Sequence, residues 1–159
     1  MATLVSVAAV IKRSARAILL TDNGELLLIK RTKPGQQPYW TAPGGGVENT
    51  DASVEAALYR ELAEELGARV ADASQVFLVS MPAEGGVSLQ HIFAARLSKI
   101  DEQARSGEEY ADPSRGGYEL ERVDLRSEAL SAVDLKPAVL KEFILANRDA
   151  LLAEVALAP

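Results

Sequence analysis

The chain has 159 residues, 48% of them hydrophobic and 25% charged, which indicates a single globular domain over residues 1–159. Its net charge of -6 and pI of about 4.9 argue against wrapping a nucleic acid, which requires a basic face. The sequence contains no cysteine, which excludes a disulfide framework, a thiolate metal site and a cysteine nucleophile. A metal ion bound here would therefore have oxygen ligands.

No apolar run approaches the roughly 20 residues of a membrane-spanning helix, and the N-terminal stretch MATLVSVAAVI lacks the charged region of a signal peptide. We therefore expect a cytoplasmic protein without a membrane partner. The sequence leaves the oligomeric state open, with a homodimer as one alternative.

The N-terminal part predicts two antiparallel strands over residues 14–21 and 25–31, joined by a hairpin at Asn23-Gly24, where both positions tolerate positive φ. Residues 32–47 are rich in turn formers and end in the run Gly44, Gly45 and Gly46. Such glycines let the backbone approach a ligand closely.

A helix is predicted from about residue 53 to 66, because Val54, Leu58, Leu62 and Leu66 recur every four residues and Gly67 is a typical helix end. Further strands are expected over residues 74–80, 88–97 and 118–125, and one C-terminal helix over 136–155, with Pro137 near its first turn. Residues 101–118 have the composition of a loop.

Three acidic residues, Glu61, Glu64 and Glu65, cluster near the end of the predicted helix, and Glu64 and Glu65 lie in its last turn. Glutamates four residues apart repel each other there, and the helix end already carries partial negative charge, so the placement costs stability. Two interpretations are open. The carboxylates converge on a divalent cation such as Mg²⁺, or they form a solvated face with Arg60 paired to Glu64.

The glycine run together with RELAEELG resembles the box of the Nudix hydrolase family, in its MutT-like form: G, five residues, E, seven residues, R-E-U-x-E-E-x-G-U, where U is apolar. The match covers residues 44–68. The family residues are found at Arg60, Glu61, Leu62, Glu64, Glu65 and Gly67. The resemblance implies an α/β fold, a Nudix-type α/β/α sandwich with a mixed β-sheet.

The box departs from the family pattern at its first glutamate. With the family spacings kept from Gly46, that position holds Ala52; if Asp51 takes its place, the stretch to Arg60 is one residue longer than usual. In the family this residue mainly braces the loop and helix through the arginine, and Asp51 could do so. The closing apolar position is Ala68, smaller than is typical.

The resemblance implies a pyrophosphohydrolase that cleaves the diphosphate linkage of a nucleoside diphosphate joined to another moiety, with Mg²⁺ or Mn²⁺ as cofactor. Glu64 and Glu65 would be metal ligands, Glu61 a ligand or the general base, and Arg60 would hold the cluster in place. A carbonyl of the glycine run, that of Gly45, could complete the coordination. Bases or ligands from outside the box are also found in the family, and the candidates are Glu108, Glu109 and Glu121.

Candidate substrate-binding residues are Trp40, Arg31 and Glu109. Trp40 either stacks on a base or fills the core, and Arg31, with Lys30 and Lys33, could meet phosphates. His91 is expected to be a hydrogen-bonded strand residue rather than a catalyst.

Two alternatives to a hydrolase remain. A non-catalytic nucleotide-sensing Nudix module would typically have lost box glutamates or carry a DNA-binding segment. An isopentenyl-diphosphate isomerase-like enzyme is disfavoured because that chemistry uses a cysteine. The identity of the substrate does not follow from the sequence.

Overall fold

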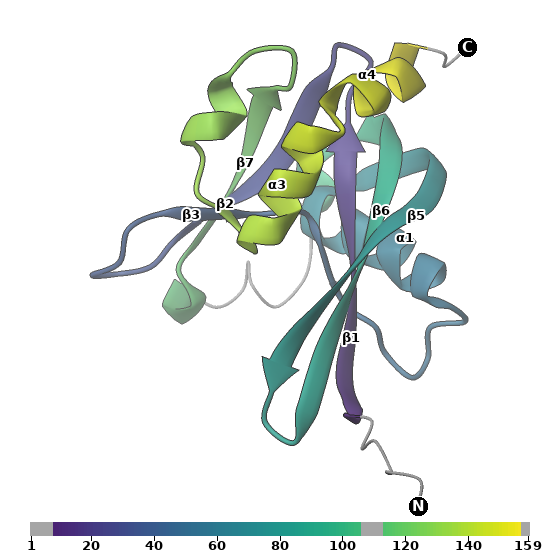
Figure 1. The fold of residues 1–159 in the computed structure, drawn as a ribbon, viewed down its shortest axis with the longest axis vertical. Helices are drawn as coiled ribbons and strands as arrows, with labels where there is room; N and C mark the ends of the chain where they lie inside the picture. Colours follow the sequence, from purple (N-terminus) through teal and green to yellow (C-terminus); the bar gives the residue numbers. More distant parts are fainter. Residues whose placement is uncertain (1–7, 106–112, 157–159) are drawn as a thin grey trace, which may run out of the picture.

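The computed structural model describes residues 8–105 and 113–156, which form a mixed sheet covered by helices (Figure 1). The strands are β1 (Val10–Leu20), β2 (Glu25–Thr32), β3 (Tyr39–Thr41), β4 (Gly44–Gly46), β5 (Ala68–Ala83), β6 (Gly86–Ile100), β7 (Gly117–Asp124) and β8 (Leu135–Lys136). The helices are α1 (Val54–Leu66), α3 (Ala138–Ala146) and α4 (Arg148–Ala156), with short 3-10 turns η1 (Glu102–Ala104), η2 (Pro113–Arg115) and η3 (Ala129–Ala132). None of the described helices is long and apolar enough to cross a membrane.

The strands are ordered β5-β6-β1-β2-β3-β8, with β4 paired to β1 and β7 paired to β2. The pairs β1–β6 and β3–β8 are parallel and the others are antiparallel, so the sheet is mixed. The registered pairs of β1 with β2 are confined to Leu19 and Leu20. Further back along β1, residues 14–16 pair with β4 instead. The two long strands thus separate, and the glycine strand is inserted beside β1.

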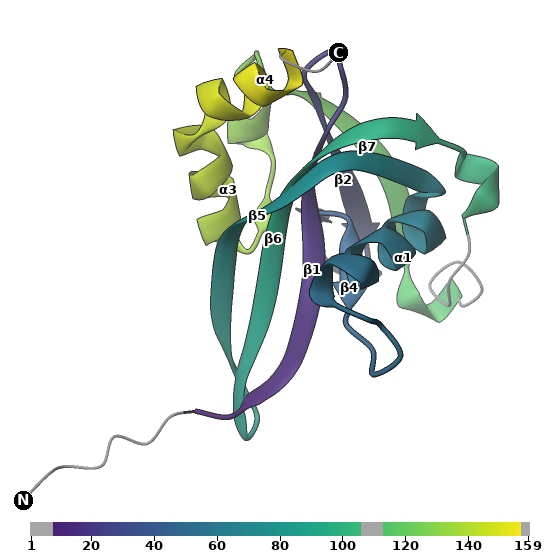
Figure 2. The ribbon, with the colours of Figure 1, turned by 90° about the vertical axis from the view of Figure 1, so that its right-hand side faces the viewer.

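Alternation along the strands produces two apolar faces. Leu27 and Ile29 belong to the core cluster that α1 covers with Leu58, Leu62 and Leu66. Leu26 and Leu28 belong to the opposite cluster, which α3 and α4 cover with side chains such as Ile144 and Leu151. Figure 2 shows α1 on one side of the strands and α3 and α4 on the other. The predicted α/β/α sandwich is confirmed.

Three sequence predictions need correction. The C-terminal segment forms two helices, because the chain leaves the helical conformation at Asn147 (φ -112°, ψ 17°), whose side-chain amide donates to the carbonyl oxygen of Phe143 at 2.8 Å. The turn-rich segment contains two short strands, β3 and β4. The next two strands are longer than predicted, with 16 and 15 residues, because they pair with each other along a hairpin.

Candidate functional site

The helix α1 has the boundaries that its sequence predicts. The hydroxyl of Ser53 accepts a hydrogen bond from the amide of Ala56 at 3.0 Å, which caps the first turn. Gly67 ends the helix in the left-handed conformation at φ 61°. Because Leu58 and Leu62 are fully buried against the sheet, the helix presents its polar residues toward the glycine strand.

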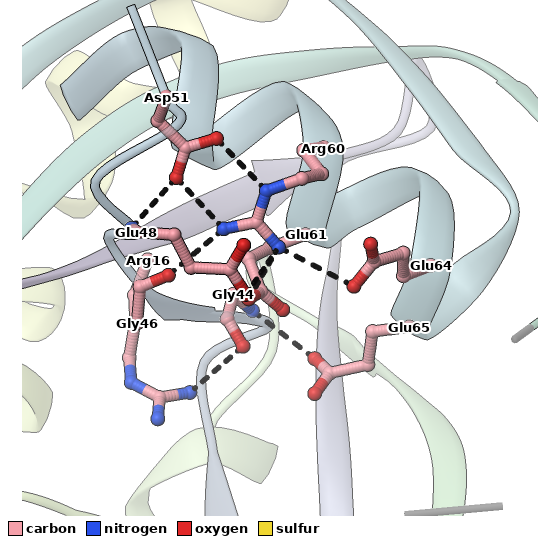
Figure 3. A network of polar contacts seen from close by, with 9 residues as sticks. All are labelled: Arg16, Gly44, Gly46, Glu48, Asp51, Arg60, Glu61, Glu64 and Glu65. Atoms are coloured by element: carbon pink, nitrogen blue, oxygen red, sulfur yellow. Dashed lines mark hydrogen bonds and ion pairs between the residues drawn. The ribbon is translucent and has the colours of Figure 1, made fainter. Parts of the chain in front are cut away.

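The glycine strand β4 lies directly against the acidic side of α1. A Cβ atom at Gly45 would come within 2.4 Å of the Cδ and Oε2 atoms of Glu61, so only glycine leaves room for that carboxylate. The amide of Gly44 donates a hydrogen bond of 3.0 Å to Oε1 of Glu65, a side chain that is buried. Loop and helix therefore form one site (Figure 3).

Arg60 is the centre of the polar network in Figure 3. Its Nε and Nη2 atoms each donate to Asp51, to Oδ1 and Oδ2 respectively, at 2.9 Å. Nη2 also donates to the carbonyl oxygen of Gly46 at 3.0 Å. Nη1 donates to Glu61 at 3.0 Å and to Glu64 at 3.4 Å. One guanidinium thus connects the loop before α1, the glycine strand and two box glutamates.

Asp51, and not Ala52, faces Arg60 from the position of the missing family glutamate. The carboxylate also accepts a hydrogen bond from the amide of Glu48 at 2.8 Å. The Arg60 guanidinium, followed by this amide, lowers the pKa of Asp51 from 3.8 to about 2. The same carboxylate, more than that of Glu61, raises the pKa of Arg60. The pair is therefore charged throughout the physiological range.

The three box carboxylates do not gather around a single point. In residues 8–105 and 113–156, no group of three or more acidic, histidine or cysteine side chains is arranged to hold a metal ion. The arrangement differs from the expected convergence, because Arg60 binds Glu61 and Glu64 while Glu65 binds the amide of Gly44, and the metal site remains a prediction. The donors are nonetheless all oxygens, as Mg²⁺ and Mn²⁺ prefer, so the residues fit such an ion chemically.

The last turn of α1 contains no basic residue, and a cation reaches it from a distant segment. Nε of Arg105 donates to the backbone carbonyl of Glu65 at 2.9 Å, and Nη2 donates to the carbonyl of Tyr118 at 3.2 Å. A cation beside the terminal carbonyls opposes the negative end of the helix dipole. Glu65 is thus fixed through its side chain on one side and its backbone on the other.

A cavity of about 420 Å³ lies between β1, β3, β5, β6 and residues 134–138. Arg16 on β1 belongs to its lining, and Nη1 of Arg16 donates to the carbonyl of Ala42 at 2.8 Å. The other lining residues are Thr41, Met81, Gln90, Asp134, Leu135, Lys136, Pro137 and Ala138. A larger cavity of about 600 Å³ lies between β5, β6 and the C-terminal helices, and none of residues 44–67 lines either cavity. The smaller cavity approaches the box through Arg16, whose Nη1 lies 3.5 Å from the carbonyl oxygen of Gly44.

The structure places the candidate substrate residues in fixed surroundings. Trp40 is half-buried, and its indole nitrogen donates to the carboxylate of Glu121. The guanidinium of Arg31 lies 3.6 Å from the centre of the Tyr118 ring and donates to the carbonyl of Arg115 at 2.7 Å. Both side chains therefore have structural contacts, and their roles toward a substrate remain predictions.

Of the three candidates for a base outside the box, the structure describes Glu121. Glu121 is paired in register with Leu28, whose core cluster lies on the sheet face opposite α1. Its carboxylate accepts the hydrogen bond from the indole nitrogen of Trp40, and its role as a base or ligand remains a prediction. Glu108 and Glu109 lie outside the described residues.

His91 has a hydrogen-bond partner at each ring nitrogen. Nε2 lies 2.9 Å from Nη1 of Arg13, and Nδ1 lies 3.0 Å from Oε1 of Gln75. Because the guanidinium can only donate, the neutral tautomer with a proton on Nδ1 satisfies both contacts. The geometry agrees with the interpretation of His91 as a structural residue.

The same contacts predict how stability depends on pH. Burial, and secondarily the charge of Arg13, lower the pKa of His91 below 6.5. The unfolded chain then binds a proton that the folded chain does not, so the free energy of unfolding should fall as the pH drops below about 6.5. Urea unfolding at pH 7.5 and 5.5 measures this. Since His91 is the single histidine, His91→Gln should flatten the profile; an equal slope in the variant would contradict the assignment.

Comparison with known proteins identifies the class. The NUDIX domain model matches residues 10–127. The Escherichia coli ORF135 protein, solved in solution, is 30% identical over 87% of this chain and 91% of its own, with a TM-score of 0.60. A MutT NUDIX hydrolase from Burkholderia pseudomallei is 28% identical over 73% and 84%, with a TM-score of 0.55. No curated protein matches the chain.

The chain belongs to the Nudix family, and the resemblance read from its box is confirmed. It is a MutT-like Nudix pyrophosphohydrolase by class. A NUDIX hydrolase from Nitrosomonas europaea, 18% identical over 86% of this chain and 90% of its own with a TM-score of 0.63, shares the fold.

The sequence did not single out Arg16, Gln90 or Lys136. Their strand or strand-end positions are far apart along the chain, and nothing in the local patterns marks them. The parallel pairing of β1 with β6 and of β3 with β8 brings them to one cavity.

Proposed function

We propose that the chain is a Mg²⁺- or Mn²⁺-dependent hydrolase that cleaves the diphosphate linkage of a nucleoside diphosphate joined to another moiety. The observation that carries this proposal is the network in which Arg60 joins Asp51, Gly46, Glu61 and Glu64 beside the glycine strand. An acidic helix face without a ligand would need no such connection to a glycine strand. Membership of the Nudix family supports the same chemistry.

Glu61, Glu64, Glu65 and the carbonyl of Gly45 would hold the metal ion. When bound, the ion neutralises charge on the diphosphate and activates the attacking water. Arg60 holds two of the carboxylates in place, and the amide of Gly44 holds the third. Glu61 is either a ligand or the group that accepts a proton from the water, and its carboxylate lies 3.0 Å from Nη1 of Arg60.

The nucleoside would occupy the 420 Å³ cavity, which is lined by polar and apolar groups and which Arg16 borders beside the carbonyl of Gly44. Nucleotide pockets commonly combine an apolar lining with a few polar groups that fix the orientation. With the nucleoside there, the diphosphate would extend toward the box. The metal ion and the cavity would then hold opposite ends of one substrate.

We expect the purified protein to hydrolyse at least one member of a panel of nucleoside triphosphates, dinucleoside polyphosphates, ADP-ribose and nucleotide sugars. Release of phosphate, pyrophosphate or nucleotide should require Mg²⁺ or Mn²⁺ and cease in a chelator, because the charged linkage resists attack without a cation. A panel without turnover in either metal would favour the non-catalytic sensor.

The homodimer remains a prediction, which sedimentation equilibrium would test.

A further inference from the structure

Arg16 is half-buried on β1 and is bonded to the chain through one of its nitrogens. Nη1 donates to the carbonyl of Ala42 at 2.8 Å and lies 3.5 Å from the carbonyl of Gly44. These contacts orient the guanidinium at the point where the glycine strand begins. The side chain is therefore placed beside the box without belonging to it.

The remaining donors of Arg16 have no partner in the described part of the chain. A guanidinium carries five N–H donors, and in residues 8–105 and 113–156 no hydrogen bond from Nε or Nη2 and no carboxylate within 4.0 Å is present. The residue lines the 420 Å³ cavity. A positively charged guanidinium group thus borders a cavity in a protein of net charge -6.

Arg16 and Glu65 contact different backbone groups of Gly44. The guanidinium lies by the carbonyl of Gly44, and the Glu65 carboxylate accepts from its amide (Figure 3). A cation and a proposed metal ligand thus both contact Gly44. A substrate that extends from the cavity to the box would pass Arg16 at the junction of nucleoside and diphosphate.

We infer that Arg16 binds the phosphate group attached to the nucleoside, an inference that rests on the proposed function. A phosphate offers two oxygens to the fork of Nε and Nη2, and such charge-assisted pairs are stronger than bonds between neutral groups. An acceptor edge of the base is the competing partner. The phosphate fits better because Arg16 is bonded to the carbonyls of Ala42 and Gly44, where the chain enters the glycine strand of the box.

Binding measurements with nucleosides and their monophosphates, on the wild type and on variants of Arg16, test this inference. Adenosine, guanosine, cytidine and uridine are titrated beside their 5′-monophosphates in EDTA, by calorimetry, against the wild type and Arg16→Gln. The wild type should bind at least one monophosphate about tenfold or more tightly than its nucleoside. Arg16→Gln should lose most of that preference and leave the affinity for the nucleoside nearly unchanged, because only the phosphate contact is removed. Arg16→Lys should be intermediate, since it keeps the charge but not the fork.

The matched control is Arg122→Gln, which removes an exposed arginine of β7 and should preserve the wild-type preference. Melting curves establish that each variant is folded. Three results would overturn the inference: an unchanged phosphate preference in Arg16→Gln, an equal loss for nucleoside and monophosphate, or a wild type without any such preference. The proposed function is judged separately by metal-dependent turnover, so the two can fail independently.

Discussion

Replacement of Glu65 by glutamine should lower kcat/KM by about 100-fold or more, the largest effect of any conservative change in the box. The metal ion is expected to supply several kcal/mol of charge stabilisation, and each 1.4 kcal/mol corresponds to a factor of ten in rate. Glutamine retains an oxygen that can accept the hydrogen bond from the amide of Gly44. The change therefore removes charge while preserving the local structure, and steady-state kinetics in saturating Mg²⁺ measure the effect.

Two variants calibrate this result. Glu55→Gln removes an exposed carboxylate from the first turn of the same helix and should leave kcat/KM within about twofold. Asp51→Ala should give an intermediate loss, because it deprives Arg60 of its bidentate partner but removes no proposed metal ligand. The assignment of Glu65 would be wrong if its variant kept more than about a third of the wild-type activity. If Asp51→Ala changed neither the turnover nor the melting temperature, the assignment of Asp51 as the brace of Arg60 would be wrong.

Magnesium should raise the melting temperature of the wild type by about 5–10 °C at a concentration one hundred times its dissociation constant. Binding to the folded state alone contributes about 2.7 kcal/mol at that ratio, and each kcal/mol shifts a domain of this size by about 2–4 °C. Glu64→Gln should reduce the shift because it removes one proposed ligand. In chelator the variant should melt close to the wild type, since loss of the Arg60 contact at 3.4 Å is offset by relief of repulsion between carboxylates.

Differential scanning calorimetry at constant ionic strength, with Ca²⁺ and chelator as controls, measures both proteins. A solvated acidic face paired through Arg60 predicts the same midpoint with and without Mg²⁺, and the same effect of Glu64→Gln in both. The structure has no carboxylate triad arranged for an ion in its described residues. An unmoved wild-type midpoint in an active enzyme would therefore mean that the substrate completes the metal site.

Local patterns determined those elements whose contacts are close along the chain. The helix α1 is specified by its apolar stripe, by Ser53 at its start and by Gly67 at its end, all within 15 residues. The hairpin of β1 and β2 follows from the turn at Gly24, whose amide donates to the carbonyl of Thr21 at 3.0 Å. The box residues are likewise contiguous, so the family and the candidate ligands could be identified from the sequence.

The tertiary structure decided what depends on register and on distant neighbours. It selected Asp51 over Ala52 as the partner of Arg60, because the loop before α1 carries the aspartate back to the guanidinium. It placed Glu121 on the far face, since one residue of strand register reverses the direction of a side chain. Strands such as β3 and β4 are too short for any periodic signal and exist through pairing with distant segments.

The position of Arg16 illustrates the same division. The sequence shows Arg16 among the apolar residues of a strand that also carries Lys12 and Arg13, a pattern equally typical of a surface charge. Separation of β1 from β2 and insertion of the glycine strand turn that arginine toward Gly44 and the cavity. Chemistry carried by a contiguous motif can be read along the chain, whereas the groups around a substrate come from strands that meet only after the sheet has formed.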